Sequence, residues 1–270
     1  MNLLTDDATA IAARFLAARR QAGGLDSYPG DFPRTLDEAY AVQDAAIAAW
    51  ARPVLGWKVG RINPPLAERF GTDRLTGPIF AVERAGAGGE GPAMPVFADG
   101  FAAGEAEFLL RIGRAPAAGQ LRFTLEESAD LIESVHVGIE IASSPLGSIN
   151  QLGPIAVVSD FGNNNGLVVG PEIPDWRSSG FEDWLVTTLV DGAEAGSGRA
   201  SAFPDGAIGA ARFLFELMAK RGIALAPGQW ISSGAVGGVH DARPGQRVEA
   251  RFADRYTVAC VLRPARPEAD

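Results

Sequence analysis

The sequence has little of what builds disulfides, zinc clusters and histidine relays. Its one cysteine, Cys260, excludes a disulfide within the chain and any cysteine cluster for zinc. Its two histidines, His136 and His240, are too few for a multi-histidine metal site. Metal binding or acid–base chemistry would therefore have to come mostly from carboxylates and lysines.

Long apolar runs and basic clusters are missing as well. No run approaches the ~20 apolar residues that a membrane-spanning helix needs. The net charge is −9, from 24 basic and 33 acidic residues, and no lysine or arginine block is present. This balance argues against nucleic acid and anionic membranes as partners. The N-terminal stretch is acidic where a secretory signal needs basic residues, so we expect a cytoplasmic protein.

The chain does have enough apolar material for a large core. Of its 270 residues, 47% are hydrophobic, which excludes a disordered chain. Helical spacing predicts one helix ending at Gly23, a second starting at Thr35, and two more over 124–134 and 203–221. Short β-rich runs between glycines and prolines predict strands at 56–62, 77–83, 105–112, 135–142, 156–161, 166–170, 184–190, 231–236, 246–252 and 256–262.

These elements predict an α+β fold in two parts. Residues 1–75 form a small mixed region of helix and strand, and residues 76–270 form a large β-rich body with crossing helices. We expect the chemistry to lie in the second part.

An acidic pair opens one of the predicted strands. Glu105 and Glu107 are two residues apart and therefore project from the same face of the strand. Glu140 lies between two isoleucines in another strand, where a buried and unpaired carboxylate would be costly. Three carboxylates from two strands suit a hard cation such as Mg²⁺ or Mn²⁺. A solvated sheet face lined by glutamates is the alternative, and the spacing leaves it open.

A lysine in an apolar setting is the second candidate feature. Lys58 lies in GWKVG, between Trp57 and Val59. Burial would lower the pKa of this lysine and suit it to proton transfer. The alternative is a surface lysine lying over the tryptophan ring.

Two polar, glycine-rich segments complete the candidate set. SDFGNNNG at 159–166 begins after an apolar run, and Asp160 within it is predicted as a second catalytic residue. Asparagines tolerate left-handed backbone, so a plain hairpin is the alternative there. ISSGAVGG at 231–238 offers Ser232, Ser233 and backbone N–H groups to a carboxylate or oxyanion. A loop without a ligand remains the alternative for that segment.

Taken in order, these segments resemble the 2-keto-4-pentenoate hydratase and 4-oxalocrotonate decarboxylase family, within the fumarylacetoacetate hydrolase superfamily. The segments are TLDEAYAVQDA at 35–45, GWKVG at 56–60, TGPIFA at 76–81, GEAEFLLRI at 104–112, GIEIASS at 138–144, SDFGNNNGLVVG at 159–170 and ISSGAVGG at 231–238. The resemblance implies a β-roll-like fold, a homo-oligomer, and Mg²⁺ or Mn²⁺ held by Glu105, Glu107 and Glu140. It also implies that Lys58 is the acid–base or oxyanion-stabilising residue.

The resemblance implies a small 2-oxo acid or its 2-hydroxydienoate tautomer as substrate. The first expectation is a hydratase that adds water to 2-hydroxy-2,4-dienoates in aromatic catabolism. The alternatives are a 2-oxo-3-enedioate decarboxylase, an acylpyruvate C–C hydrolase and a non-catalytic homologue. Two departures from the hydratase pattern bear on the substrate. Leu75 stands where an acidic residue is expected, and Arg61 lies where a Ser-Lys pair is common. Arg61 is predicted to bind a distal carboxylate, with a structural salt bridge as the alternative.

Overall fold

The structure is a computed structural model that describes residues 3–86 and 89–268. Its strands are β1 Gly56–Arg61, β2 Arg74–Ile79, β3 Val82–Arg84, β4 Ala93–Val96, β5 Phe101–Ile112, β6 Ile132–Ser144, β7 Asn164–Glu172, β8 Val186–Val190, β9 Ala193–Gly198, β10 Trp230–Ser232, β11 Arg247–Phe252 and β12 Tyr256–Pro264. Its α-helices are α1 Leu3–Gln21, α2 Leu36–Trp50, α3 Leu66–Phe70, α4 Leu125–Asp130, α5 Ile149–Leu152, α6 Pro154–Ser159 and α7 Gly206–Arg221. Single 3₁₀ turns are η1 Phe161–Asn163, η2 Phe181–Asp183 and η3 Ala200–Ala202. The predicted α+β class is confirmed.

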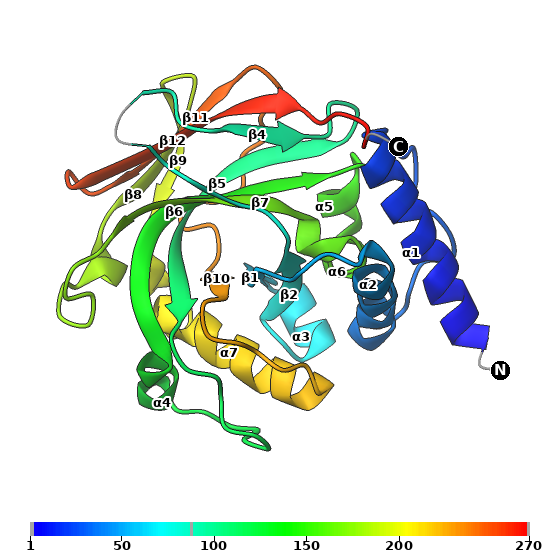
Figure 1. The fold of residues 1–270 in the computed structure, drawn as a ribbon, viewed down its shortest axis with the longest axis horizontal. Coiled ribbons are helices and arrows are strands. Elements are labelled where there is room, and N and C mark those ends of the chain that lie inside the picture. The colour runs from blue at the N-terminus through cyan, green and yellow to red at the C-terminus, as the bar shows by residue number, and fades with distance from the viewer. Residues whose placement is uncertain (1–2, 87–88, 269–270) are drawn as a thin grey trace.

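The strands form two packed sheets (Figure 1). The larger has the order β2-β1-β10-β5-β6-β7-β3, and the smaller has the order β4-β12-β11-β8-β9. The long antiparallel pair β5 and β6 lies at the centre of the larger sheet. Phe108 on β5 contacts Phe252 of the smaller sheet, with ring centroids 5.3 Å apart. The apolar face of β5 therefore builds the core between the sheets, and Glu105 and Glu107 lie on its other face.

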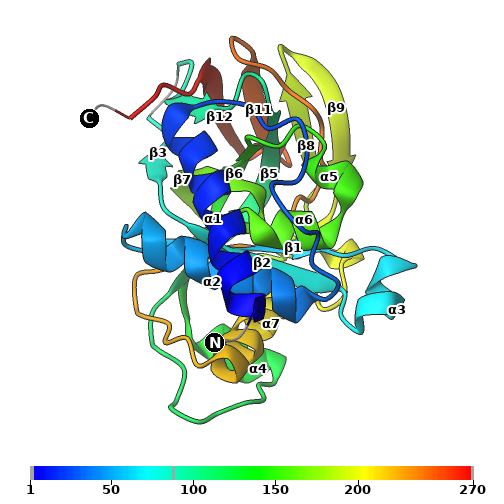
Figure 2. The same cartoon turned by 90° about the vertical axis from the view of Figure 1, so that its right-hand side faces the viewer.

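Helices close the remaining sides of the sheets. In Figure 1 α7 lies below the larger sheet, and α1 and α2 lie together at the opposite side from β8. Figure 2 shows α1 crossing in front of α2. Phe15 of α1, Ala46 of α2 and Phe161 belong to one buried apolar cluster. The N-terminal helices are thus packed against the segment that leads from α6 into β7.

The predicted strand 77–83 is divided between β2 and β3, and the predicted strand 231–236 ends at Ser232. Two further predicted elements differ from the structure. The run 156–161, predicted as a strand, is mostly the helix α6. Pro154 occupies the first helical turn, a position that proline favours, and α6 packs on α2 through buried Val158. Tertiary packing thus overrides the β-propensity of the valines. The predicted helix 124–134 ends at Asp130, because the chain from Ile132 onward pairs with β5.

The predicted division at residue 75 falls inside β2, which pairs with β1 in the larger sheet.

Within the part of the chain that the structure describes, none of the helices is long and apolar enough to cross a membrane.

Candidate metal centre

Three glutamates from the two central strands meet in the interior. In the antiparallel ladder Glu105 lies directly opposite Glu140, and Glu107 is two residues further along β5. All three side chains are buried. One carboxylate oxygen from each lies within 4.8 Å of the others. The alternative of a solvated sheet face is therefore wrong, because burial removes these carboxylates from water.

Each of two glutamates has one oxygen held and one oxygen left over. Glu107 Oε2 accepts hydrogen bonds from Ser232 Oγ at 2.5 Å and from the Gly234 N–H at 2.8 Å. Glu140 Oε1 accepts from Asn164 Nδ2 at 2.9 Å. Within residues 3–86 and 89–268, Glu107 Oε1 and Glu140 Oε2 have no hydrogen-bond partner. Buried acceptors without partners are costly and call for a ligand.

Lys58 is the basic residue of this cluster. It is buried on β1, and its Nζ lies 3.3 Å from Glu140 Oε1. Gly77, opposite Lys58 on β2, has no side chain, and a Cβ there would lie 2.2 Å from the Phe161 carbonyl. Gly77 of TGPIFA thus lets the η1 turn pack directly over the lysine. The alternative of a surface lysine is wrong.

The electrostatics of the cluster show an excess of buried negative charge. Burial raises the pKa of Glu105 to about 7, with Lys58 opposing and Glu140 adding to the rise. Burial and the neighbouring Glu140 and Glu105 hold the pKa of Glu107 well above its usual range. Burial alone would lower the pKa of Lys58, but the three carboxylates outweigh it and raise that pKa. The prediction of a lowered lysine pKa is therefore wrong for the protein without a cation.

These features fit a hard divalent cation. Mg²⁺ and Mn²⁺ prefer carboxylate oxygens, with bond lengths near 2.1 Å for Mg²⁺. Two ligand oxygens on opposite sides of such an ion are about 4.2 Å apart, which is within the 4.8 Å span of the triad. A bound cation would also neutralise the charge excess and give the two free oxygens a partner. Ligand carboxylates whose second oxygen is hydrogen-bonded are typical of metal sites.

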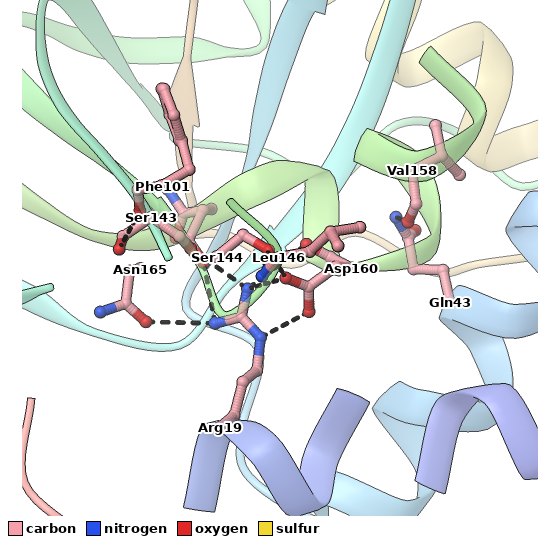
Figure 3. A network of polar contacts seen from close by, with 10 residues as sticks. Arg19, Gln43, Phe101, Ser143, Ser144, Leu146, Val158, Asp160 and Asn165 are labelled. Atoms are coloured by element: carbon pink, nitrogen blue, oxygen red, sulfur yellow. Dashed lines mark hydrogen bonds and ion pairs between the residues drawn. The ribbon is translucent and has the colours of Figure 1, made fainter. Parts of the chain in front are cut away.

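Asp160 lies elsewhere. Its two carboxylate oxygens accept from Arg19, at 2.6 Å from Nε and 2.9 Å from Nη2, and Ser144 Oγ donates to the second at 2.6 Å. Figure 3 shows this buried ion pair. Both oxygens of Asp160 are bonded to structural partners outside the triad, so these contacts give it a structural role, and its predicted catalytic role stays a prediction.

Of the predicted substrate-binding residues, Arg61 lies away from the triad, whereas Ser232 contacts it. Arg61 is three residues after Lys58 on β1, so strand alternation turns it to the opposite face, where its guanidinium lies 4.9 Å from the Phe203 ring centroid. Among the residues that the structure describes, Arg61 forms this ring contact and no salt bridge. Its predicted contact with a substrate carboxylate stays a prediction. Ser232 binds Glu107 and is a support for the triad. In the described chain, the buried Ser233 Oγ has no hydrogen-bond partner.

Two residues of the site escaped the sequence reasoning. Asn164 holds Glu140, and its own Oδ1 accepts from the Gly166 N–H at 3.0 Å, which fixes which way the amide faces. Arg19, on α1, holds the segment that carries Asn164. The run of three asparagines was a signal for the first, while nothing near Arg19 in the sequence marks it.

Comparison with known proteins gives the fold. No protein-family model matches the sequence, and no curated protein matches it. Among solved structures, 4-oxalocrotonate decarboxylase from Pseudomonas putida G7, complexed with magnesium and adipate, matches with a TM-score of 0.80. The identity is 18%, and the match covers 97% of this chain and 99% of that one.

More distant matches come from hydrolases and isomerases. Fumarylpyruvate hydrolase from Pseudomonas aeruginosa, in complex with Mn²⁺ and pyruvate, has a TM-score of 0.55 and 15% identity over 77% of this chain and 89% of that one. 2-Hydroxyhepta-2,4-diene-1,7-dioate isomerase from Mycobacterium marinum has a TM-score of 0.56 and 18% identity over 79% and 77%. These matches confirm the fold that the predicted resemblance implies.

Proposed function

We propose that the chain is a divalent-metal-dependent decarboxylase of a 2-oxo-3-enedioate, the type of substrate that 4-oxalocrotonate represents. The observation that carries the proposal is the buried triad of Glu105, Glu107 and Glu140, with two free oxygens and Lys58 beside it. The full-length match to a decarboxylase crystallised with magnesium supports the same reading.

The three carboxylates would hold Mg²⁺ or Mn²⁺, with Ser232 and Asn164 orienting two of them. When bound, the cation supplies Lewis-acid stabilisation of negative charge on the C2 oxygen of a 2-oxo acid. The positive charge of the bound cation would offset the negative charge of the carboxylates, so they would attract the Lys58 ammonium less strongly. The pKa of that lysine then falls toward the range useful for proton transfer.

The reaction balances with one proton from the chain. The bond between the distal carboxylate and its neighbouring carbon breaks, and CO₂ leaves without that electron pair. The pair delocalises through the double bond to the C2 oxygen, and a proton held by Lys58 completes the 2-hydroxydienoate. The lysine then recovers a proton from water. Lys58 is thus proposed as the general acid.

The expected hydratase becomes the second candidate. Hydration of the same dienoate needs a group that activates water, and the residue at the position expected to be acidic is Leu75. It is buried, and its Cδ1 would lie 3.2 Å from a Cβ at Gly60 on the next strand. Decarboxylation needs no activated water. The specific support for hydration is Lys58, whose proton could be delivered to carbon when the dienol becomes the unsaturated ketone to which water adds.

A C–C hydrolase has less support. In this superfamily that reaction commonly uses a His–Glu pair. The two ring nitrogens of His136 contact Ser134 Oγ and the Gly170 carbonyl, and His240 contacts the Gly237 carbonyl. Within the described residues, neither histidine belongs to the triad's cluster.

The test is incubation with 4-oxalocrotonate and Mg²⁺ or Mn²⁺, following CO₂ and the organic products. We expect CO₂ and a 2-hydroxydienoate, with loss of both after EDTA and recovery on adding the cation. Lys58→Met should reduce turnover by about 10²-fold or more while keeping cation binding; Lys220→Met, at an exposed site, is the matched control.

Two other outcomes would contradict the proposal in different ways. Formation of a 4-hydroxy-2-oxo acid from the dienoate without CO₂ from the enedioate would identify the hydratase. Cation binding with no turnover of either substrate would indicate a non-catalytic homologue.

A further inference from the structure

Arg19 forms hydrogen bonds with both ends of the turn that covers the candidate metal centre. The turn comprises residues 160–164 and is called the roof turn below. Arg19 binds its start through the Asp160 carboxylate and, at 3.4 Å, the Asp160 carbonyl. It reaches the end through the Asn164 carbonyl at 3.5 Å and the adjoining Asn165 Oδ1 at 3.1 Å. Figure 3 shows the guanidinium between Asp160 and Asn165.

The other side of the roof turn faces the site. A Cβ at Gly162 would lie 2.9 Å from Lys58 Cδ, so the turn is packed directly on the lysine. Asn164, at the end of the turn, donates to Glu140 Oε1. That oxygen is also the one nearest Lys58, which leaves Oε2 as the free ligand atom. The turn therefore connects Arg19 to the orientation of one proposed metal ligand.

The backbone of the roof turn is strained, so it requires contacts such as the Arg19 hydrogen bonds to keep its conformation. Phe161 has a φ value of +55°, in the left-handed region that bulky residues rarely adopt, whereas the φ of +67° at Asn163 is one that asparagine tolerates. Conformations of this kind persist only when surrounding contacts enforce them. The Arg19 guanidinium lies 5.0 Å from the Phe161 ring centroid, in addition to its hydrogen bonds at both ends. These contacts hold the strained segment closed.

We propose that Arg19 is a positioning residue for the metal centre: by bridging Asp160 and Asn164 it keeps the Asn164 amide on Glu140 Oε1 and so presents Oε2 to the cation. This inference rests on the proposed function, since it assumes that the triad binds a divalent cation. Arg19 touches none of the ligands itself. Its effect must therefore pass through Asn164, and that requirement makes the proposal testable.

The experiment is a double-mutant cycle read out as the Mn²⁺ dissociation constant of the full chain, measured by calorimetry. Arg19→Lys keeps the charge beside Asp160, but one ammonium cannot bridge both ends of the turn. We expect Arg19→Lys and Asn164→Ala each to weaken Mn²⁺ binding by about 10-fold. The double variant should be no weaker than the poorer single variant, because both changes remove the same support. Arg20→Lys, on the exposed side of the same helix, should bind like the wild type.

Each outcome decides something. Wild-type Mn²⁺ affinity in Arg19→Lys, or multiplying effects in the double variant, would overturn the positioning role alone. A wild-type protein that binds no Mn²⁺ would overturn the proposed function, and this inference with it. If Arg19→Lys does not fold, Arg19→Met combined with Asp160→Asn removes both charges of the pair and carries the same expectation.

Discussion

Two buried charged clusters lie on either side of the roof turn, and they differ in how their charges are balanced. Arg19 and Asp160 form a neutral pair in which both carboxylate oxygens are bonded. The cluster of Glu105, Glu107, Glu140 and Lys58 has three acids for one base, and two of its oxygens have no partner within the described chain. Both clusters are buried, but only the triad has more acids than bases and carboxylate oxygens without a partner, and this difference is why we propose the triad as the functional site.

The largest expected effect is on catalysis, at the unbalanced cluster. Glu140→Gln removes a charged ligand, so kcat/KM should fall about 10³-fold, which corresponds to several kcal/mol of lost charge stabilisation. The control is Glu133→Gln on the same strand, where the side chain is exposed and lies 3.6 Å from Arg111. Steady-state kinetics at saturating Mg²⁺ measures both. Equal losses in the two variants would mean that the triad has no special role.

In the absence of metal, removing a carboxylate charge should have opposite effects on stability in the two clusters. Asp160→Asn leaves the buried Arg19 without its counter-charge and should lower the free energy of unfolding by about 3–5 kcal/mol. Glu105→Gln removes one of the excess buried charges, and at pH 8 it should raise that free energy. Urea unfolding in EDTA measures both. A destabilised Glu105→Gln protein would show that the triad is balanced without a cation.

The pH dependence of the metal-free protein should follow from the triad. The pKa of Glu105 rises from an ordinary 4.5 to about 7 on folding, so the folded state favours the protonated form. Its contribution to stability is full below about pH 4.5 and is lost as the pH rises to about 7, on the order of 3 kcal/mol. Saturating Mg²⁺ should reverse this loss. Melting temperatures from pH 5 to 8, with and without Mg²⁺, test it, and a flat metal-free profile would contradict the account.

The smallest effect is expected at Arg61. Because it faces away from Lys58 and stacks on Phe203, Arg61→Ala should change kcat/KM by less than about twofold. A large rise in KM for a dicarboxylic substrate, with kcat unchanged, would restore the predicted substrate contact and place the distal carboxylate near Phe203.

Strand alternation predicted that Glu105 and Glu107 share a face, and the resemblance implied that Glu140 joins them. Glu105 and Glu107 had to share a face, opposite Phe108, and the structure agrees. The role of Asp160 was not predictable, because its partner Arg19 lies 141 residues away in the sequence. The β-propensity of the run 156–161 predicted a strand, but packing against α2 makes most of this run helical. For Lys58 the pattern left both a buried and a surface position open, and the structure shows the buried one. Its pKa depends on three acids that only the fold brings together.

We propose that a divalent cation completes the unbalanced cluster. Isothermal titration calorimetry of the metal-free protein with Mn²⁺, compared with Glu107→Gln, tests it most directly. The predicted result is one binding site per chain in the wild type, with affinity lost in the variant, where a ligand is neutralised but its shape is kept. Absence of binding in the wild type, or equal affinity in both proteins, would contradict the claim.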